Sequence, residues 1–201
     1  MITVSDHAPD AAFYFDLSSP EAYLAAERVI GVLGAPARWQ PVLARELAGA
    51  ESFDAFRCAQ ERAIFRAELE RRAAAQGLQP VVWPDPFPFD SERAMRVATF
   101  AAGIGKVVAY SLAAFRQAFA GGRSLAVAEN VLIAAAACEM HPAAVERAAA
   151  RETLGATLAA ATASAAAAGV RDVPAVRIGE LVFHGADAPE RAAEALAVSR
   201  A

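Results

Sequence analysis

The fold of this chain is decided by a short stretch near its start, Phe13-Tyr14-Phe15-Asp16-Leu17-Ser18-Ser19-Pro20-Glu21. Its aromatic half is typical of a buried strand, and Pro20 is typical of the first position of a helix, where no N–H is needed. Ser19 is then the N-cap of that helix, and the Glu21 carboxylate faces the positive end of the helix dipole. A strand that runs straight into a helix N-terminus forms a site that stabilises an anion.

The composition predicts one folded domain with room for an elaboration. The chain has 201 residues, of which 56% are hydrophobic, and a net charge of −4. No stripe of basic residues gives the electrostatic signature of a nucleic-acid partner. The first ten residues are polar and acidic, unlike a secretory signal, and no uncharged stretch is apolar enough to span a membrane. We therefore expect a cytoplasmic protein without nucleic-acid or membrane partners.

The two cysteines, Cys58 and Cys138, lie far apart in the sequence and form no Cys-x-x-Cys motif. Neither a disulfide framework nor a metal site is predicted from them. Both stand in helical, partly apolar contexts, and we expect them to be small core residues, because free cysteine is strongly buried in proteins.

Hydrophobic periodicity and turn residues predict strand, helix, strand, a long helical block, and then helix, strand, strand, helix. The first three elements form a right-handed βαβ unit with parallel strands. The expected strands are 11–17, 37–43, 175–178 and 181–183, and the expected helices are 20–33, 52–76, 90–120 with a break near Gly103 and Gly105, 124–140, 141–168 and 187–198. The stretch 141–168 is either one continuous helix or two helices, the second starting after Gly155.

A stiff extended loop is predicted over residues 80–89, because four prolines there forbid a helix and restrict the residues that precede them. Trp83, Phe87 and Phe89 stand in this loop. Their aromatic side chains either plug a core or wall a pocket.

Several separated motifs resemble the group of 2-hydroxychromene-2-carboxylate isomerases and kappa-class glutathione transferases in the DsbA-like superfamily. The similarity spans residues 13–196, and the motifs are 13–20, Pro41-Val42-Leu43, Phe87-Pro88 followed by Ala94 and Arg96, 115–119, 169–174 and Gly185-Ala186-Asp187. The resemblance implies an α/β, thioredoxin-like fold with a large all-helical insertion after the second strand. Residues 1–44 and 169–201 would form the thioredoxin-like domain, and residues 45–168 would form the helical insertion and the return helix.

In this family the serine before the proline is the catalytic residue, which corresponds to Ser19, and its hydroxyl hydrogen-bonds the sulfur of glutathione. Thioredoxin-like proteins often carry Cys-x-x-Cys at this joint, but Ser18-Ser19-Pro20-Glu21 contains no sulfur, so dithiol chemistry by the usual route is excluded. The joint is instead suited to stabilise a thiolate brought in by another molecule. The alternative is that Ser19 is a plain N-cap. Ser18 ranks below Ser19 as the contact residue.

The resemblance also assigns a glutathione-binding role to Val173, Pro174, Ala186 and Asp187. A cis bond before Pro174 would present the Val173 main chain to the ligand as a short strand edge. The alternatives are an ordinary trans proline at a strand start, and a helix capping box formed by Asp187 with Glu190.

The substrate pocket is expected to include Ser18, Trp83, Phe87 and His184. His184 is either a structural residue or a proton-transfer group, for which histidine has a suitable pKa.

The predicted function is that of a glutathione-dependent isomerase of the 2-hydroxychromene-2-carboxylate type, with Ser19 stabilising the thiolate of glutathione or of another low-molecular-weight thiol. The alternatives are a kappa-like glutathione transferase, and a non-catalytic thioredoxin-fold binding protein. The last is favoured by Ala186 and by the absence of asparagine from residues 44–51, which the family often carries there. The expected partners are a small aromatic or electrophilic substrate and a second copy of the chain in a homodimer.

Overall fold

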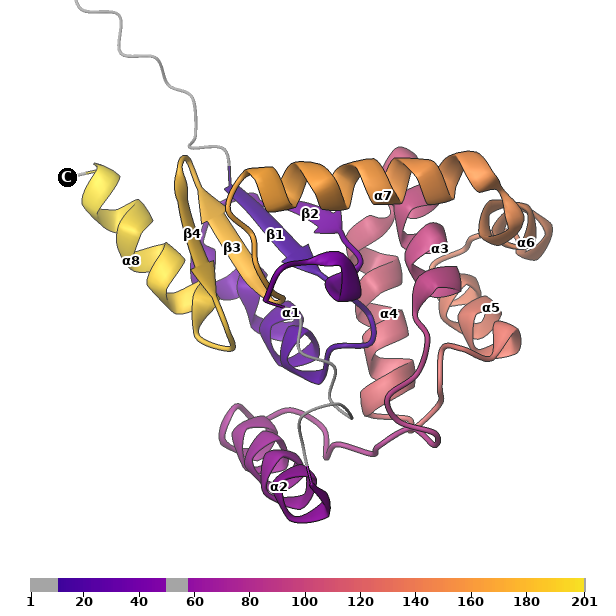
Figure 1. Cartoon of the computed structure of the whole chain (residues 1–201), viewed down its shortest axis with the longest axis horizontal. Coiled ribbons are helices and arrows are strands. Elements are labelled where there is room, and N and C mark those ends of the chain that lie inside the picture. The colour runs from indigo at the N-terminus through magenta and orange to yellow at the C-terminus, as the bar shows by residue number, and fades with distance from the viewer. Residues whose placement is uncertain (1–10, 50–57, 201) are drawn as a thin grey trace, which may run out of the picture.

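The computed structural model describes residues 11–49 and 58–200 (Figure 1). Its strands are β1 (Ala11–Phe15), β2 (Arg38–Pro41), β3 (Ala175–Ile178) and β4 (Leu181–His184). Its α-helices are α1 (Pro20–Leu33), α2 (Ala59–Ala75), α3 (Glu92–Gly103), α4 (Val107–Phe119), α5 (Ala128–Ala136), α6 (Pro142–Ala150), α7 (Glu152–Ala167) and α8 (Ala188–Arg200), and a short 3₁₀ turn, η1 (Ala44–Glu46), follows β2.

The strands form one mixed sheet in the order β2-β1-β3-β4. β1 and β2 are parallel, whereas β3 is antiparallel to β1 and to β4. The helices α2 to α7 all lie between β2 and β3 in the chain. This confirms the predicted α/β, thioredoxin-like fold with an all-helical insertion after the second strand. The proposed domain boundaries at residues 44 and 168 stay a prediction.

The two faces of the sheet are buried by different helices, because alternate residues of β1 point to opposite sides. Ala12 and Tyr14 pack with Ala165 of α7. Phe13 and Phe15 face the larger core, which includes residues of α1, α3, α4 and α8. Figure 1 shows the strands in one half of the molecule and α3, α4, α5 and α6 in the other half.

An aromatic chain joins these two halves. The ring of Phe15 lies 5.7 Å from that of Trp39 and 5.9 Å from that of Phe115 in α4, measured between ring centres. Tyr23 of α1 in turn stacks on Phe119 at 5.8 Å. The sheet and the helical insertion therefore share one hydrophobic core.

Most predicted elements are present; β1 and β2 are shorter than expected, whereas β4 and α8 extend further at their C-terminal ends. The predicted break near Gly103 and Gly105 separates α3 from α4, and Gly34 ends α1 in the left-handed conformation with φ of 56°. The expected helix 124–140 contains only α5. Of the expected helix 52–76, the structure describes α2, and Phe53 and Phe56 lie outside the described residues.

The expected organisation of 141–168 is wrong, because the break falls at Arg151 instead of after Gly155. Gly155 is a residue of α7, and its missing side chain has a packing role. A Cβ atom at this position would come within 3.2 Å of the Arg96 guanidinium of α3. Glycine here permits close approach of two helices.

The expectation that both cysteines are core residues is wrong for Cys58 and holds in part for Cys138, which packs against the hydrophobic core. Cys58 is exposed and caps α2, where its main-chain N–H donates to Glu61 Oε2 at 2.9 Å. Cys138 is half-buried, and its thiol donates to the carbonyl of Ala134 at 3.5 Å.

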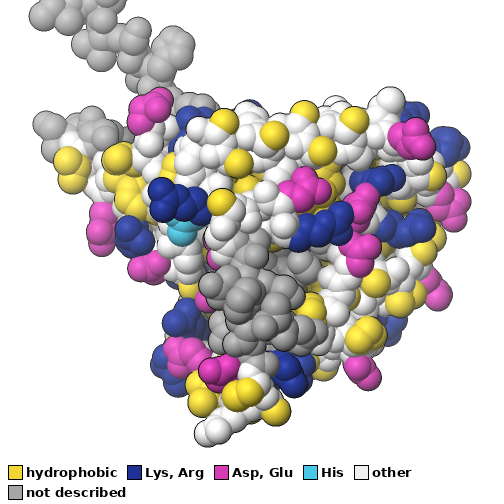
Figure 2. All heavy atoms as spheres, in the orientation of Figure 1, with side chains coloured by type: hydrophobic (Ala, Val, Ile, Leu, Met, Phe, Trp, Pro, Cys, Tyr) yellow, Lys and Arg dark blue, Asp and Glu magenta, His cyan; other side chains and the backbone are white. Residues whose placement is uncertain are grey.

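The surface carries mixed charges. On the described part of the face in Figure 2, Lys and Arg side chains lie beside Asp and Glu side chains. None of the described helices combines the length and the apolar character needed to cross a membrane.

Candidate functional site

Four chain segments meet at one end of the sheet. Phe15, the last residue of β1, pairs with Pro41, the last of β2. Tyr14 pairs with Ala175, the first residue of β3, and Ala175 pairs with His184, the last of β4. The residues after β1, β2 and β4 and those before β3 therefore lie together. This register brings 16–19, 42–49, 171–174 and 185–187 to the same end.

Ser19 caps α1, and within the described residues its own proton is uncommitted. Its Oγ accepts a hydrogen bond from the N–H of Ala22 at 3.1 Å, and its main-chain N–H donates to the carbonyl of Asp16 at 3.0 Å. The Ser19 hydroxyl donates to no acceptor among residues 11–49 and 58–200. The side chain is half-buried, so the hydroxyl is held by the cap and remains able to donate to a ligand.

Ser18 differs from its neighbour because its proton is already used. The Ser18 hydroxyl and the Ser18 N–H both donate to Asp16 Oδ1 at 2.9 Å. Of the two adjacent hydroxyls, Ser19 is therefore the one suited to stabilise an incoming anion.

Asp16 is a residue of this end of the sheet that the sequence analysis did not single out. The side chain is buried, with 2% of the residue exposed. Its Oδ2 accepts from the N–H of Ala44 at 2.9 Å, in addition to the bonds from Ser18. Asp16 therefore fixes the turn that presents Ser19 to the loop that follows β2. An acid directly after an aromatic strand was the only available signal.

The Val173–Pro174 peptide bond is cis, as the resemblance implies. The N–H of Val173 donates to Oδ1 of Asp172 at 2.7 Å. The carbonyl of Val173 accepts from no donor in the described part of the chain. The carbonyl of Pro174 accepts from the N–H of Gly185 at 3.0 Å, which holds the two segments together. Among the described residues the Val173 carbonyl thus has no partner, and the Val173 N–H is held by an exposed side chain.

His184 has a structural contact. Its Nε2 accepts from the N–H of Arg171 at 3.0 Å, which ties the end of β4 to the turn before Pro174. Burial lowers the pKa of His184; the Asp172 carboxylate opposes this shift, and nearby arginines add to it. Burial and the hydrogen bond accepted from Arg171 therefore both favour the neutral imidazole.

The alternative role of Asp187 and Glu190, a helix capping box, is supported by no hydrogen bond between the two residues in the described part of the chain. Glu190 Oε1 is instead paired with Arg28 of α1, whose Nη2 also donates to the carbonyl of Ala186 at 2.7 Å. Arg28 therefore clamps residues 185–187 onto α1. Asp187 is left 69% exposed, with Arg191 Nη1 at 4.0 Å from its carboxylate.

Trp83 and Phe87 belong to an aromatic cluster beside α1. Their rings lie 6.4 Å and 6.2 Å from Phe119, which stacks on Tyr23 one turn after Ser19. Trp83 Nε1 donates to Glu70 Oε1 at 2.7 Å. Both rings are half-buried, whereas Phe89 is buried. Phe89 thus completes the core, and the part of Trp83 and Phe87 in a pocket wall stays a prediction.

The negative charge of Glu21, next to Ser19, is partly balanced by an arginine of α2. Arg72 Nη1 lies 3.9 Å from Glu21 Oε1, and Arg72 Nε also donates to Glu68 at 2.8 Å. A cation therefore accompanies the carboxylate at the start of α1.

Among the residues that the structure describes, no cluster of three or more acidic, histidine or cysteine side chains could hold a metal ion.

The comparisons with known proteins agree with this architecture. The model of the family described as DSBA-like thioredoxin domain matches residues 12–197. A 2-hydroxychromene-2-carboxylate isomerase has a similar structure, with a TM-score of 0.80 and 18% identity over 94% of this chain and 95% of that chain. A probable DsbA oxidoreductase from Streptomyces coelicolor has a TM-score of 0.79 and 19% identity over 96% and 90% of the two chains.

The cytosolic disulfide reductase DsbM from Pseudomonas aeruginosa, solved with GSH, has a TM-score of 0.64 and 16% identity over 95% of this chain and 97% of that chain. No curated protein matches the sequence significantly. At these identities the likeness to solved structures concerns the fold.

Proposed function

The chain belongs to the family of DSBA-like thioredoxin domains, and from this premise we propose that it is a glutathione-dependent isomerase of the 2-hydroxychromene-2-carboxylate type. The observation that carries the proposal is the Ser19 hydroxyl, which is fixed at the N-terminus of α1 with its proton uncommitted among the described residues. Members of the enzyme group that the chain resembles use such a serine in place of a thiol.

Two interactions at this site, the hydrogen bond from Ser19 and the field of the helix N-terminus, would stabilise a thiolate at neutral pH. A free thiol has a pKa of about 8.5 and is mostly protonated at pH 7. A hydrogen bond to a charged acceptor contributes about 1.5–3 kcal/mol. A helix N-terminus adds about 0.3–1 kcal/mol. Together these correspond to a pKa lower by about 1.3–2.9 units, at about 1.4 kcal/mol per unit. Ser19 would therefore shift the thiol strongly toward its ionised form at neutral pH.

The described residues fit glutathione as the source of that sulfur. The carbonyl of Val173, which has no partner in the described ranges, can accept an N–H from a peptide, and the Val173 N–H can donate to a peptide carbonyl once Asp172 moves away. Asp187 is exposed at the same end of the sheet, where it can receive the ammonium of the γ-glutamyl group. Pro174 and Ala186 complete the proposed contact surface, and another small thiol would meet the same Ser19.

When bound, glutathione supplies a nucleophilic sulfur that adds to a conjugated double bond and leaves again after rotation, without net oxidation or reduction. Ser19 donates its hydrogen bond to the sulfur before attack and after departure. Asp16 keeps the Ser18 hydroxyl from competing for the same position. The proposed substrate is a small aromatic or electrophilic molecule beside Trp83 and Phe87, and the proposed assembly is a homodimer.

The test mixes the protein, glutathione and a 2-hydroxychromene-2-carboxylate, and follows isomerisation by absorbance. Two variants separate the cap from the hydrogen-bond donor. Ser19→Thr keeps both and should retain activity, whereas Ser19→Asp keeps the cap and loses the donor. Removal of one donor to a reacting anion costs about 10²–10³ in rate, and we expect Ser19→Asp to fall by that factor.

The matched control is His141→Ala, which removes the N-cap of α6, where His141 Nδ1 accepts from the N–H of Ala143 at 3.2 Å. This variant should lose some stability and no activity. Full activity in Ser19→Asp, or no acceleration by the native protein, would refute the proposal. A stable thioether formed with an electrophilic aryl halide, without isomerisation, would assign the protein to the kappa-like transferases instead.

A further inference from the structure

Arg66 of α2 carries a charge that no neighbour balances. Among residues 11–49 and 58–200 its guanidinium forms no ion pair, and its Nε atom is buried without a hydrogen-bond partner. The residue as a whole is half-buried. A cation that is partly removed from water and has no counter-ion attracts an anion more strongly than a fully solvated one, because the local dielectric constant is lower. Arg66 is therefore a candidate contact for an anionic ligand.

The same helix shows what an ordinary arginine does. Arg71 donates twice to Glu68, at 2.7 and 2.9 Å. Glu70 stands four residues after Arg66, a spacing that usually permits an ion pair on a helix. Its Oε1 instead accepts the indole N–H of Trp83 at 2.7 Å. The carboxylate that α2 offers to Arg66 is thus engaged elsewhere.

Aromatic rings hold the Arg66 guanidinium in place. Its Cζ lies 4.8 Å from the centre of the Trp83 ring and 5.9 Å from the centre of the Phe87 ring. The two rings meet edge to face at 5.0 Å. Cation–π contacts of this kind position a guanidinium and leave its charge uncompensated. Both rings are half-buried, so part of their surface remains for the apolar part of a ligand.

Arg66 lies on the side of the molecule where α1 begins. Arg72 Nη1 comes within 3.9 Å of Glu21 Oε1, two residues after Ser19. Arg66 precedes Arg72 by six residues, or roughly 9 Å along α2 at 1.5 Å per residue. The unpaired cation therefore belongs to the same side of the molecule as the proposed catalytic hydroxyl.

We propose that Arg66 binds the carboxylate of the substrate while Trp83 and Phe87 contact its rings, so that the Ser19 site prefers planar aromatic acids to neutral electrophiles. This inference rests on the proposed function, which places the reacting carbon at Ser19. A guanidinium suits the role because its planar set of donors matches the two oxygens of a carboxylate. Arg66 would act as a specificity-determining residue and take no part in the bond changes.

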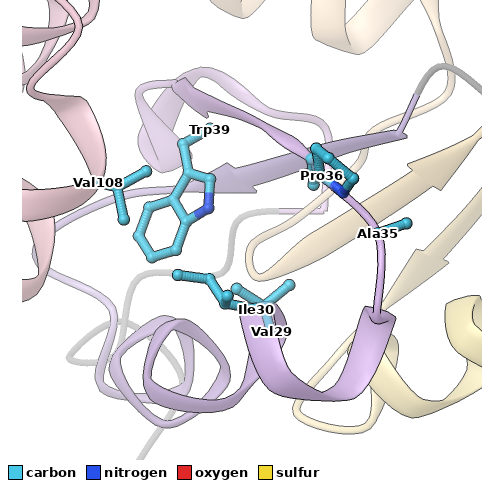
Figure 3. Close-up of a pocket in the computed structure, with 7 residues that line it drawn as sticks. Val29, Ile30, Ala35, Pro36, Trp39 and Val108 are labelled. Atoms are coloured by element: carbon cyan, nitrogen blue, oxygen red, sulfur yellow. The ribbon is translucent and has the colours of Figure 1, made fainter. Parts of the chain in front are cut away.

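The first measurement needs neither glutathione nor turnover. 2-Naphthoate, a flat two-ring acid without an electrophilic double bond, is titrated into ¹⁵N-labelled protein, and the two indole N–H signals are assigned with Trp83→Phe. The Trp83 signal should move with a dissociation constant on the order of 1 mM. The Trp39 signal is the internal reference and should stay in place, because Figure 3 shows this ring beside Val29 and Ile30, near the other end of α1.

The role of the charge is tested with 2-naphthamide, which has the same shape and is neutral. Native protein should bind this amide about tenfold more weakly than the acid, since a hydrogen bond between charged groups is lost. In Arg66→Gln the acid and the amide should bind equally, within about twofold. The matched control is Arg71→Gln, which removes the same charge from an exposed position of α2 and should keep the tenfold preference.

Turnover supplies a second measurement. With 2-hydroxychromene-2-carboxylate and glutathione, Arg66→Gln should raise KM about tenfold and leave kcat within about threefold, because a contact made equally in ground state and transition state affects binding alone. Arg71→Gln should change neither constant.

Three results would overturn the inference: a Trp83 signal that does not move with 2-naphthoate, equal affinity of native protein for acid and amide, or loss of the acid preference in Arg71→Gln as well as in Arg66→Gln. The preference is a ratio within each variant, so a loss of stability in Arg66→Gln does not imitate it. An acid preference through Arg66 without isomerisation would refute only the proposed function. Isomerisation without an acid preference would refute only the role of Arg66.

Discussion

At the scale of single residues, Asp172 determines how open the Val173 main chain is. Its carboxylate occupies the Val173 N–H at 2.7 Å, so a peptide that pairs with this residue must first displace it. We expect Asp172→Ala to bind glutathione about three- to tenfold more tightly, because displacing this exposed carboxylate from the Val173 N–H costs on the order of 1 kcal/mol. Titration calorimetry measures the change.

The matched control for that measurement is Asp187→Ala. It removes a second exposed carboxylate from the same end of the sheet and should weaken binding if Asp187 receives the γ-glutamyl ammonium. Equal effects of the two substitutions would mean that only the net charge matters, and would contradict both assignments.

Asp16 is expected to be the most sensitive polar residue of the site. Asp16→Ala leaves the N–H groups of Ser18 and Ala44 and the Ser18 hydroxyl without their acceptor. We expect the free energy of unfolding to fall by about 3 kcal/mol in urea titration, since the lost bonds end on a buried carboxylate. Asp90→Ala, an exposed acid bonded to Arg45, should cost less than about 1 kcal/mol. A similar loss in both variants would show that burial of Asp16 is irrelevant.

The sequence predicted local features of the site and missed its long-range contacts. The Ser19 cap follows from three adjacent residues. The acceptor role of Asp16 depends on Ala44, which is 28 residues away in the sequence. The two residues come close in space only when β1 and β2 pair. The contact of His184 with Arg171 likewise requires the hairpin of β3 and β4 to be formed. Such partners depend on strand register, which a single sequence does not specify.

At the scale of elements, His184 should make the hairpin that carries it sensitive to acid. The imidazole pKa is lowered in the folded protein, so the unfolded chain binds the proton more readily. The stabilisation is complete above the unfolded pKa of about 6.5 and is lost as the pH falls through the lower folded value. Thermal melts between pH 7.5 and pH 5 should therefore show falling stability.

The variant His184→Gln supplies the comparison, because glutamine offers an acceptor oxygen and does not titrate in this range. The difference in melting temperature between native protein and variant should shrink as the pH falls. A difference that stays constant from pH 7.5 to pH 5 would rule out His184 as the titrating group.

The helical insertion shows where element prediction stops. Gly103 and Gly105 mark the end of α3 correctly, because Gly105, just past the helix, adopts a left-handed φ of 72° that glycine tolerates. Arg151 ends α6 with a ψ angle of 115° and carries no such signal. Gly155 carries the signal but serves the contact with Arg96. In an alanine-rich segment without clear periodicity, packing between helices decides the boundary.

At the scale of the whole molecule, the shared aromatic core should make the sheet and the insertion unfold together. Trp39 lies in β2, and Trp83 lies in the segment between α2 and α3. Single-tryptophan variants, Trp83→Phe and Trp39→Phe, report on the two halves separately. Because Phe15 packs on Phe115 across the boundary, each variant should give a single transition whose midpoint is the same by fluorescence and by circular dichroism.

Two separated midpoints within either variant would instead mean that the proposed domains, 1–44 with 169–201 and 45–168, unfold independently. Phe115→Ala would then be expected to leave the sheet transition unchanged. If the core is shared, the same substitution should lower the free energy of unfolding by about 3–5 kcal/mol, whether it is measured with Trp39 or with Trp83.

The serine at the start of α1 has a consequence for chemical damage. Peroxides and alkylating agents attack thiolates, and Ser19 offers them none. Cys58 is exposed and would be modified first, whereas burial raises the pKa of the Cys138 thiol and slows its reaction. Iodoacetamide treatment followed by dialysis should thus leave the proposed centre intact. Oxidants would act by consuming the small soluble thiol, and fresh reductant alone would restore turnover.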